Sequence, residues 1–286
     1  MVRMERPVIM IDFCHIAPTP HLDLVKDRNT HLLLAHLVED DLAYRQFYID
    51  LKKERDVTYI LDNSAFEMYK QGRPMYPSSK LIDMGKLVSA DYIVMSDYPG
   101  QVGQQTISTA CAMAPMLREA GFKTFFVPQS EVGNLHDYVQ TCMWASAVNH
   151  VDYIGISILG VPNAYGVEKD NKLQRFLSRW KLMHTLQDKG FFDNCIKHGK
   201  KIHMLGMVDG PNEITLVRNF TIDTWDSSAA VWAGLNCIRF DTSPTGLIDG
   251  KFEKEVDFNF ECKDNSLIDI ARDNMDYIDQ LCGMTL

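Results

Sequence analysis

The chain has 286 residues, of which 46% are hydrophobic, and it carries a net charge of −9. That length has room for one large domain with a sizeable core, and the acidic balance argues against a general nucleic-acid-binding protein, which usually carries a basic face. No run of about 18 apolar residues occurs, which excludes a transmembrane helix, and residues 1–7 lack the apolar core of a signal peptide, so we expect a cytoplasmic protein.

Short apolar runs rich in Ile, Val, Tyr or Phe recur along the chain. They predict strands at residues 8–12, 58–62, 92–97, 123–128, 153–157, 202–206, 221–225 and 237–240. Most of these runs are apolar on both faces, as is typical of parallel strands that helices cover on both sides.

Amphipathic stretches separate the predicted strands. Residues 33–51 carry apolar side chains at spacings of three, four and seven, which indicates one helical stripe. Further helices are predicted at residues 78–90, 101–120, 134–149, 169–187, 212–219, 227–235 and 266–282. We expect residues 249–264 to form an irregular or hairpin excursion before the last helix.

Eight strand–helix alternations predict an α/β fold of the (β/α)8 TIM-barrel type. The alternative, an open doubly wound sheet, should carry a glycine-rich phosphate-binding turn after its first strand, and none follows Asp12. The sequence has no linker, low-complexity tract or internal repeat, so we expect one domain over residues 1–286.

Polar residues and glycines lie at or just beyond the ends of several predicted strands, where a parallel α/β fold places its active site. They are Asp62, Asp97, Gln129, Gly155, Gly206 and Asp226. Carboxylates gathered in one pocket repel each other, which raises some of their pKa values and suits one acid or base beside one nucleophile. The amide and the remaining acids can hold a flat heterocycle by its edge. The alternative for any single Asp is a helix N-cap after a strand.

The histidines and cysteines do not predict a metal site. Seven cysteines are scattered without a C-x-x-C pair, as expected for reduced thiols. Cys195 and His198 form a C-x-x-H pair, but zinc sites need a second pair nearby and none follows. We therefore interpret the histidines as loop residues.

Residues 168–203 form a basic segment inside the acidic chain, with nine Lys or Arg against four Asp or Glu. This excess predicts contacts with a nucleic-acid backbone. The best candidates are Lys172, Arg175, Arg179, Lys200 and Lys201. The alternative interpretation is a solvated helix face.

Five ordered segments over roughly residues 58–240 resemble the tRNA-guanine transglycosylases. They are residues 61–67 (L-D-N-S-A-F-E), 96–99 (S-D-Y-P), 127–129 (V-P-Q), 153–157 (Y-I-G-I-S) and the run from 202 to Asp226. The chain is more similar to the phage and bacterial relatives that insert 7-deazaguanines into DNA. The tRNA enzymes carry a zinc-binding subdomain with a C-x-C-x-x-C motif after the nucleophile, and nothing of that kind follows Asp226 here.

The resemblance implies a pentosyltransferase, a guanine transglycosylase. Asp226 is then the nucleophile on C1′ of the target nucleotide, and Asp62 shuttles the proton to the leaving base and from the incoming one. Asp97 and Gln129 read the edge of the base. The other substrate-binding residues that the resemblance suggests are Gly155, Ser64, Phe66 and Gly206.

The partners implied are DNA and a free 7-deazaguanine base such as preQ0, with no cofactor, no metal and no membrane. A phage-encoded enzyme of this kind works in the cytoplasm of its host, and the sequence leaves an oligomer open. One alternative acts on tRNA, and another is a catalytically inactive barrel subunit, against which the presence of both Asp62 and Asp226 argues. An unrelated lyase or aldolase barrel would need a lysine at a strand end to form a Schiff base, and we identify no such lysine at the predicted strand ends.

Overall fold

A computed structural model of the protein describes residues 10–207, 210–242 and 255–283, except for the side chain of Lys172. Within these ranges the strands are β1 (Asp12–His15), β2 (Thr30–Leu34), β3 (Thr58–Asp62), β4 (Tyr92–Val94), β5 (Lys123–Phe126), β6 (Tyr153–Ser157), β7 (Lys201–Leu205) and β8 (Thr224–Ser227). They form one sheet in the order β1-β8-β7-β6-β5-β4-β3-β2, in which every neighbouring pair is parallel.

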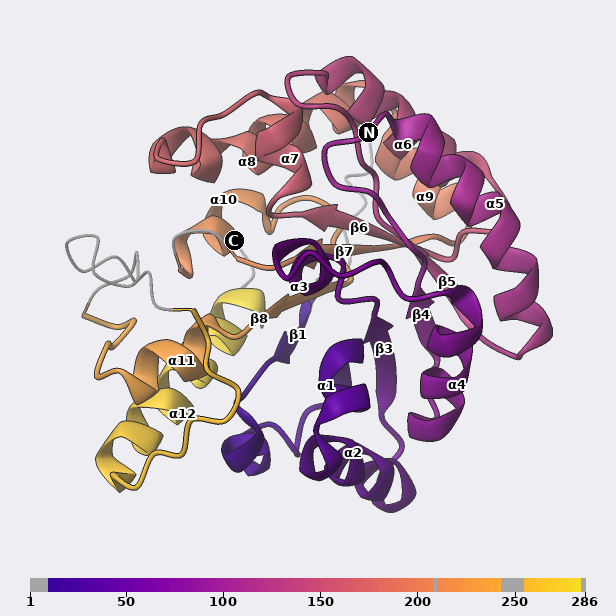
Figure 1. Ribbon diagram of the computed structural model, residues 1–286. Helices are drawn as coiled ribbons and strands as arrows, with labels where there is room; N and C mark the ends of the chain where they lie inside the picture. Colours follow the sequence, from indigo (N-terminus) through magenta and orange to yellow (C-terminus); the bar gives the residue numbers. More distant parts are fainter. Residues whose placement is uncertain (1–9, 208–209, 243–254, 284–286) are drawn as a thin grey trace, which may run out of the picture.

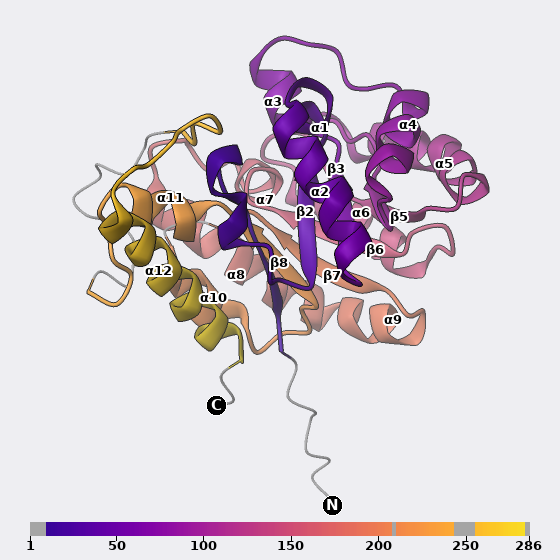
Figure 2. The same cartoon turned by 90° about the horizontal axis from the view of Figure 1, so that it is seen from below.

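The two ends of this strand order meet, which makes the sheet a nearly closed barrel. β1 contacts β2, and the Thr30 hydroxyl donates to the Asp12 carboxylate across the seam between them. Figure 2 shows the two strands side by side, with α2 (Leu42–Glu54) and α12 (Asn265–Gly283) on either side of the seam. The predicted (β/α)8 TIM barrel is therefore confirmed.

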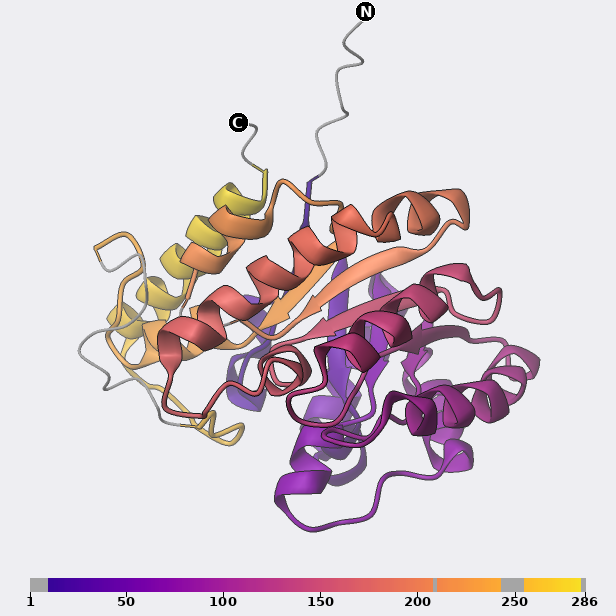
Figure 3. The ribbon, with the colours of Figure 1, turned by 90° about the horizontal axis from the view of Figure 1, so that it is seen from above.

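Helices surround the barrel (Figure 1). In addition to α2 and α12 they are η1 (Thr19–Leu24), α1 (Ala35–Asp40), α3 (Ala65–Lys70), α4 (Ser78–Val88), α5 (Gly103–Glu119), α6 (Leu135–Ala147), α7 (Gly160–Ala164), α8 (Lys172–Asp188), α9 (Phe191–Lys197), α10 (Asn212–Val217) and α11 (Ala229–Leu235). η1 is a 3-10 helix. Figure 3 shows the long helix α8 along the outside of the barrel, coloured between magenta and orange. The helices predicted from residue 78 onward match α4, α5, α6, α8, α10, α11 and α12 closely.

Aromatic side chains fill the barrel interior. The rings of Tyr92 and Tyr153 lie 5.1 Å apart, and those of Phe125 and His203 lie 5.4 Å apart. Each pair joins strands that are not neighbours in the sheet, so these contacts cross the interior. The barrel is thus a packed core, and open space for chemistry is left to the loops at its ends.

The second strand corrects the sequence interpretation. The pattern at residues 33–51 predicted one helix, but β2 ends at Leu34 and the helical part is divided into α1 and α2. All five residues of β2 are buried, because the strand is covered on both sides. Between the two helices Asp41 is extended, and its carboxylate accepts the N–H of Tyr44 as the N-cap of α2.

The predicted strand at residues 237–240 is wrong. Cys237 has a φ of +64°, which breaks an extended chain. Phe240 is buried because this segment packs against α12, where the Asn274 side chain accepts the Phe240 N–H. The apolar pattern here reflects packing under a helix.

Two other predictions are partly covered. The first strand, expected at residues 8–12, is observed at Asp12–His15, and residues 8 and 9 lie outside the described residues. Of the excursion expected at 249–264, residues 255–264 have no helix or strand before Asn265, and the rest lies outside the description. Within the described residues, no helix has the length and apolar character that crossing a bilayer requires.

Candidate active site

The carboxyl end of the barrel gathers the polar side chains predicted at the strand ends. Asp62 is the last residue of β3, Asp226 lies near the end of β8, and Asp97 and Gln129 lie in the loops after β4 and β5, which end at Val94 and Phe126. Asp97 is 4% exposed, Gln129 is 2% exposed and Asp226 is 7% exposed. Because all eight strands are parallel, one end of the barrel holds four polar groups in a largely dry setting.

Asp226 is held through one of its two oxygens. Its Oδ1 lies 2.9 Å from Nε2 of His203 and accepts the backbone N–H of Gly206 at 3.0 Å. Both donors come from β7 or the residue after it, and β7 pairs directly with β8. The Asp226 side chain keeps 10% exposure. The arrangement fixes the orientation of the carboxylate while leaving Oδ2 without a hydrogen-bond donor among the described residues.

Gly206 needs its lack of a side chain. Its φ is +68°, and a Cβ atom there would lie 2.7 Å from the Ile158 side chain. Its carbonyl accepts the indole N–H of Trp225 at 2.8 Å and an N–H of Arg179 at 2.7 Å. Gly206, predicted as a substrate-binding residue, thus has a structural role: it aims its N–H at Asp226.

Asp62 has its pKa raised well above the ordinary value. Burial is the largest cause, and the nearby charges of Glu67, Asp226 and Asp97 raise it further. The Ser64 N–H, which donates to Asp62 Oδ2 at 2.9 Å, opposes the shift. A pKa raised in this way favours the protonated carboxyl group, which is the form that a general acid needs.

Glu67 adds a fourth carboxyl group to the same region, beside Asp62, Asp97 and Asp226. It lies on α3, which in Figure 1 crosses the barrel mouth. Burial raises its pKa, and the charge of Asp226 contributes to the shift. Glu67 ends the segment 61–67 and was not among the predicted site residues.

Asp97 and Gln129 form a buried polar pair. The Gln129 amide donates to Asp97 Oδ2 at 2.6 Å, and the Asn63 amide donates to Asp97 Oδ1 at 2.9 Å. Burial raises the pKa of Asp97, and these two bonds partly offset the shift. Asn63 also donates to the Met95 carbonyl at 2.8 Å, which ties the end of β3 to the end of β4.

The side-chain carbonyl oxygen of Gln129, Oε1, is buried without a hydrogen-bond partner among the described residues. A Cβ atom added to Gly160, the first residue of α7, would lie 3.1 Å from it. A buried acceptor without a partner costs free energy of about 1–3 kcal/mol. Such an atom beside Asp97 is suited to accept an N–H group from a bound ligand.

Three further substrate-binding predictions fall on residues with other contacts. A Cβ at Gly155 would lie 2.6 Å from both Phe125 and Leu205, so this glycine serves core packing. Ser64 is fully buried, and its hydroxyl lies 2.9 Å from Nδ1 of His36 and accepts the His36 N–H. Phe66 is 48% exposed on α3 at the mouth. Base contacts by these residues stay predictions.

The prediction that Arg179 contacts nucleic acid is wrong. Its side chain is fully buried and pairs with buried Glu213 through two hydrogen bonds, of which the one from Nε is 2.6 Å long. The same guanidinium donates to the carbonyls of Ile156, Leu205 and Gly206. Arg179 therefore braces the carboxyl ends of β6 and β7 from outside the barrel.

The remaining basic candidates do not share one surface. Lys201 opens β7 and Lys200 precedes it, so both lie at the amino end, opposite the polar cluster. Lys200 also donates to the carbonyls of Val148 and Val151. Lys172 and Arg175 start α8, which follows β6 at the carboxyl end. A single track along residues 168–203 is thus contradicted, and Arg175 is the candidate with a described side chain that starts from the same end of the barrel as the polar cluster.

Asn63 and Glu67 were not among the predicted site residues, and the interpretation of the histidines as loop residues is wrong for His203, which is buried within β7. All three lie within segments that the resemblance covers. A signal for His203 was present: a polar residue inside an otherwise apolar strand must find a buried partner. Its partner Asp226 comes from the adjacent strand, which the sequence does not reveal.

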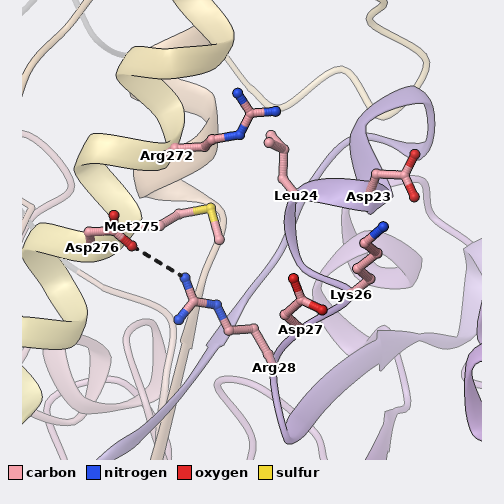
Figure 4. Close-up of a pocket in the computed structure, with 8 residues that line it drawn as sticks. All are labelled: Asp23, Leu24, Lys26, Asp27, Arg28, Arg272, Met275 and Asp276. Carbon is pink, nitrogen blue, oxygen red and sulfur yellow. Dashed lines mark ion pairs between the residues drawn. The ribbon is translucent and has the colours of Figure 1, made fainter. Parts of the chain in front are cut away.

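A separate cavity of about 500 Å³ lies on the outside of the barrel (Figure 4). It is lined by Asp23, Leu24, Lys26, Asp27, Arg28, Arg272, Met275 and Asp276. Figure 4 shows Arg28 reaching toward Asp276 of α12, and their charged groups lie 3.8 Å apart. None of these residues belongs to the strand-end cluster.

Within the described part of the chain, no group of three or more His, Cys, Asp or Glu side chains is arranged to hold a metal ion. No protein-family model matches this chain, and no curated protein matches it.

Proposed function

We propose that the protein is a guanine transglycosylase that exchanges guanine in DNA for a free 7-deazaguanine base. One observation carries the proposal: two carboxyl groups with different surroundings share the carboxyl end of the barrel. Asp226 accepts two N–H bonds on one oxygen, whereas burial and neighbouring charges raise the pKa of Asp62. Base exchange needs one carboxylate that attacks and one carboxyl group that gives and takes a proton.

In the first half of the reaction, Asp226 attacks C1′ of the target deoxyguanosine. A bond forms between the carboxylate oxygen and C1′, the bond from C1′ to the guanine nitrogen breaks, and its electron pair leaves with the base. Asp62 supplies the proton that makes the departing guanine neutral. The product is a glycosyl ester on Asp226 and an ionised Asp62.

In the second half, the free 7-deazaguanine takes the place of guanine. Ionised Asp62 removes the proton from its ring nitrogen, and that nitrogen attacks C1′. The ester bond then breaks and returns its electron pair to Asp226. Both carboxyl groups are restored, so the cycle needs no oxidant, reductant or further co-reactant.

Asp97 and Gln129 supply base recognition in this proposal. The Asp97 carboxyl and the Gln129 carbonyl oxygen are fixed by their own contacts and buried. The second of these is an acceptor without a protein partner in the described residues, so it suits an N–H group on the guanine edge. A site built around such groups strongly rejects ligands that lack the matching polar atoms.

The target nucleotide must leave the duplex to reach this end of the barrel, which costs a few kcal/mol. Arg175 on α8 lies at the same end of the barrel and is our candidate for a phosphate contact there. Exposed Phe66 and Tyr69 on α3, at 48% and 73%, offer apolar surface beside the mouth.

The test is an exchange assay with two polymers in one tube. Purified protein is incubated with tritiated guanine, duplex DNA and unmodified tRNA in equal amounts, and label is counted in each polymer. We expect label in DNA, and a chase with 7-deazaguanine should release it. Label mainly in tRNA would move the protein to the RNA branch, and label in neither polymer would reject base exchange.

Asp223 offers a matched control for the nucleophile. It immediately precedes β8, at the opposite end of that strand from Asp226, and its carboxylate accepts the Ile202 N–H at 2.8 Å. Asp226→Asn should abolish exchange, whereas Asp223→Asn, the same chemical change away from the site, should leave it largely intact. Equal loss in both variants would indicate a structural effect.

A further inference from the structure

A chain of buried hydrogen bonds leads from Tyr153, the first residue of β6, to Asp226 in β8. The Tyr153 hydroxyl lies 2.8 Å from the Thr224 hydroxyl, which lies 2.5 Å from Nδ1 of His203. Nε2 of His203 lies 2.9 Å from Asp226 Oδ1. Tyr153 is 1% exposed, Thr224 is 6% exposed and His203 is fully buried. These groups come from β6, β7 and β8, so the chain crosses the interior of the barrel.

The direction of every hydrogen bond in this chain follows from its two ends. A carboxylate only accepts, so Nε2 of His203 must carry the hydrogen. Nδ1 then accepts from the Thr224 hydroxyl, because the Thr224 oxygen already takes the single hydrogen of the Tyr153 hydroxyl. The Thr224 oxygen in turn accepts from the Tyr153 hydroxyl, which has only one hydrogen to give. All four groups are satisfied in this one arrangement, and the tautomer is assigned by the network.

The surroundings of His203 favour a fixed ring. Its imidazole packs edge-on against Phe125, with ring centres 5.4 Å apart, and lies 6.2 Å from the Tyr153 ring. A side chain packed between aromatic rings and bonded through both nitrogens has one available orientation. The Nε2 hydrogen is therefore aimed at Asp226 before any substrate binds.

We propose that His203 is a positioning residue for the nucleophile, held in its Nε2–H tautomer by Thr224 and Tyr153. This role rests on the proposed function. His203 and the Gly206 N–H both bind Oδ1, so Oδ2 is the oxygen that attacks C1′. In the glycosyl ester Oδ1 becomes the carbonyl oxygen and still accepts both bonds.

The same two donors act when the ester breaks. As the electron pair of the Oδ2–C1′ bond returns to Asp226, negative charge develops over both carboxylate oxygens. His203 and Gly206 then stabilise that charge at Oδ1 without any rearrangement. Removing one preorganised donor of this kind typically lowers kcat by about 10²–10³-fold.

Three variants separate this role from a general structural one. His203→Leu removes the donor and should lower kcat by about 10²-fold, with the KM for the free base within a few-fold of wild type. His203→Gln places an amide N–H near the position of Nε2 and should recover at least about tenfold of that loss. Thr224→Val keeps the side-chain shape but removes the hydroxyl that sets the tautomer, so its kcat should fall between those of wild type and His203→Leu.

NMR spectroscopy of the His203 ring tests the tautomer without any catalytic turnover. In protein labelled with 15N at histidine, the ring nitrogens of His203 are identified by their loss in His203→Gln. We expect Nε2 protonated and Nδ1 unprotonated in wild type, and a mixture of tautomers in Thr224→Val. Circular dichroism confirms that each variant is folded, and Thr224→Val decides the question if His203→Leu does not fold.

The outcomes distinguish this role from the underlying function. A wild-type protein that exchanges no base would reject the proposed function, while the NMR spectrum still decides the tautomer. A ring protonated on Nδ1, or a folded His203→Leu variant with kcat within threefold of wild type, would overturn the role of His203 even if exchange is robust. An equal rise in KM and fall in kcat would assign His203 to base binding.

Discussion

The Arg179–Glu213 pair predicts a large effect from a small substitution. Both side chains are fully buried, and the guanidinium donates two bonds to Glu213 and three to backbone carbonyls at the ends of β6 and β7. Glu213→Gln keeps the shape but leaves the Arg179 charge without its counter-ion. Removing one partner of a buried ion pair costs about 3–5 kcal/mol. At about 2 °C per kcal/mol for a chain of this size, Tm should fall by roughly 6–10 °C.

The assay is urea unfolding followed by circular dichroism. The double variant Arg179→Met/Glu213→Leu should recover at least half of the loss in unfolding free energy, because an apolar pair replaces a buried charge without a counter-ion. Lys181→Met, on the exposed face of the same helix, should change the unfolding free energy by no more than about 0.5 kcal/mol. The reasoning is refuted if Glu213→Gln costs less than about 1 kcal/mol, or if the double variant is less stable than Glu213→Gln.

Three further predictions follow from the site and the core. Asp62→Asn should raise the urea midpoint at pH 8 more than at pH 5. Because the pKa of Asp62 is raised in the folded protein, the wild type loses stability as pH rises from the unfolded pKa of about 3.9 through the folded pKa, and the substitution removes this loss. Equal midpoint shifts at both pH values would contradict this. Gly155→Ala should destabilise by about 1–3 kcal/mol, since its Cβ would lie 2.6 Å from two side chains; urea unfolding without a midpoint change would disprove the packing role. Arg175→Ala should reduce the slope of log binding constant against log salt concentration for DNA by about one, whereas Lys201→Ala, at the amino end of β7, should leave this slope unaltered. A reduced slope in Lys201→Ala and an unaltered slope in Arg175→Ala would place DNA at the other end of the barrel.

The fold and the strand ends were accessible from sequence for a physical reason. A parallel strand buried on both faces reads as a short continuous apolar run, and the first polar residue after it marks the carboxyl end. That rule placed Asp62, Asp97, Gln129 and Asp226 at one end of the barrel, where the structure has them.

The same rule did not predict β2, because nothing in the sequence separates this strand from the helix that follows it. Leu34 ends the strand and Ala35 begins α1 without an intervening turn, so one apolar stripe runs through both. Residues 237–240 show the reverse error, since a short apolar segment under a helix has the composition of a strand. Periodicity alone does not separate these cases.

The tertiary partners were beyond sequence reasoning. Arg179 counted as one of nine basic residues in the segment 168–203, yet its counter-ion Glu213 lies 34 positions later in the chain. The count of basic residues therefore predicted a nucleic-acid-binding surface that included Arg179, whereas Arg179 is fully buried in an ion pair. His203 and Asp226 meet only because β7 and β8 are neighbours in the barrel.

The central claim is that Asp226 forms a covalent glycosyl ester, and mass spectrometry of the protein tests it most directly. The protein is mixed with a guanine-containing DNA oligonucleotide without free base, quenched in acid, digested and analysed peptide by peptide. The account predicts a deoxyribose-linked adduct on the peptide that contains Asp226, its loss when 7-deazaguanine is added before quenching, and its absence in Asp226→Asn. An adduct on a different residue, or base exchange with no adduct at any time point, would contradict the account.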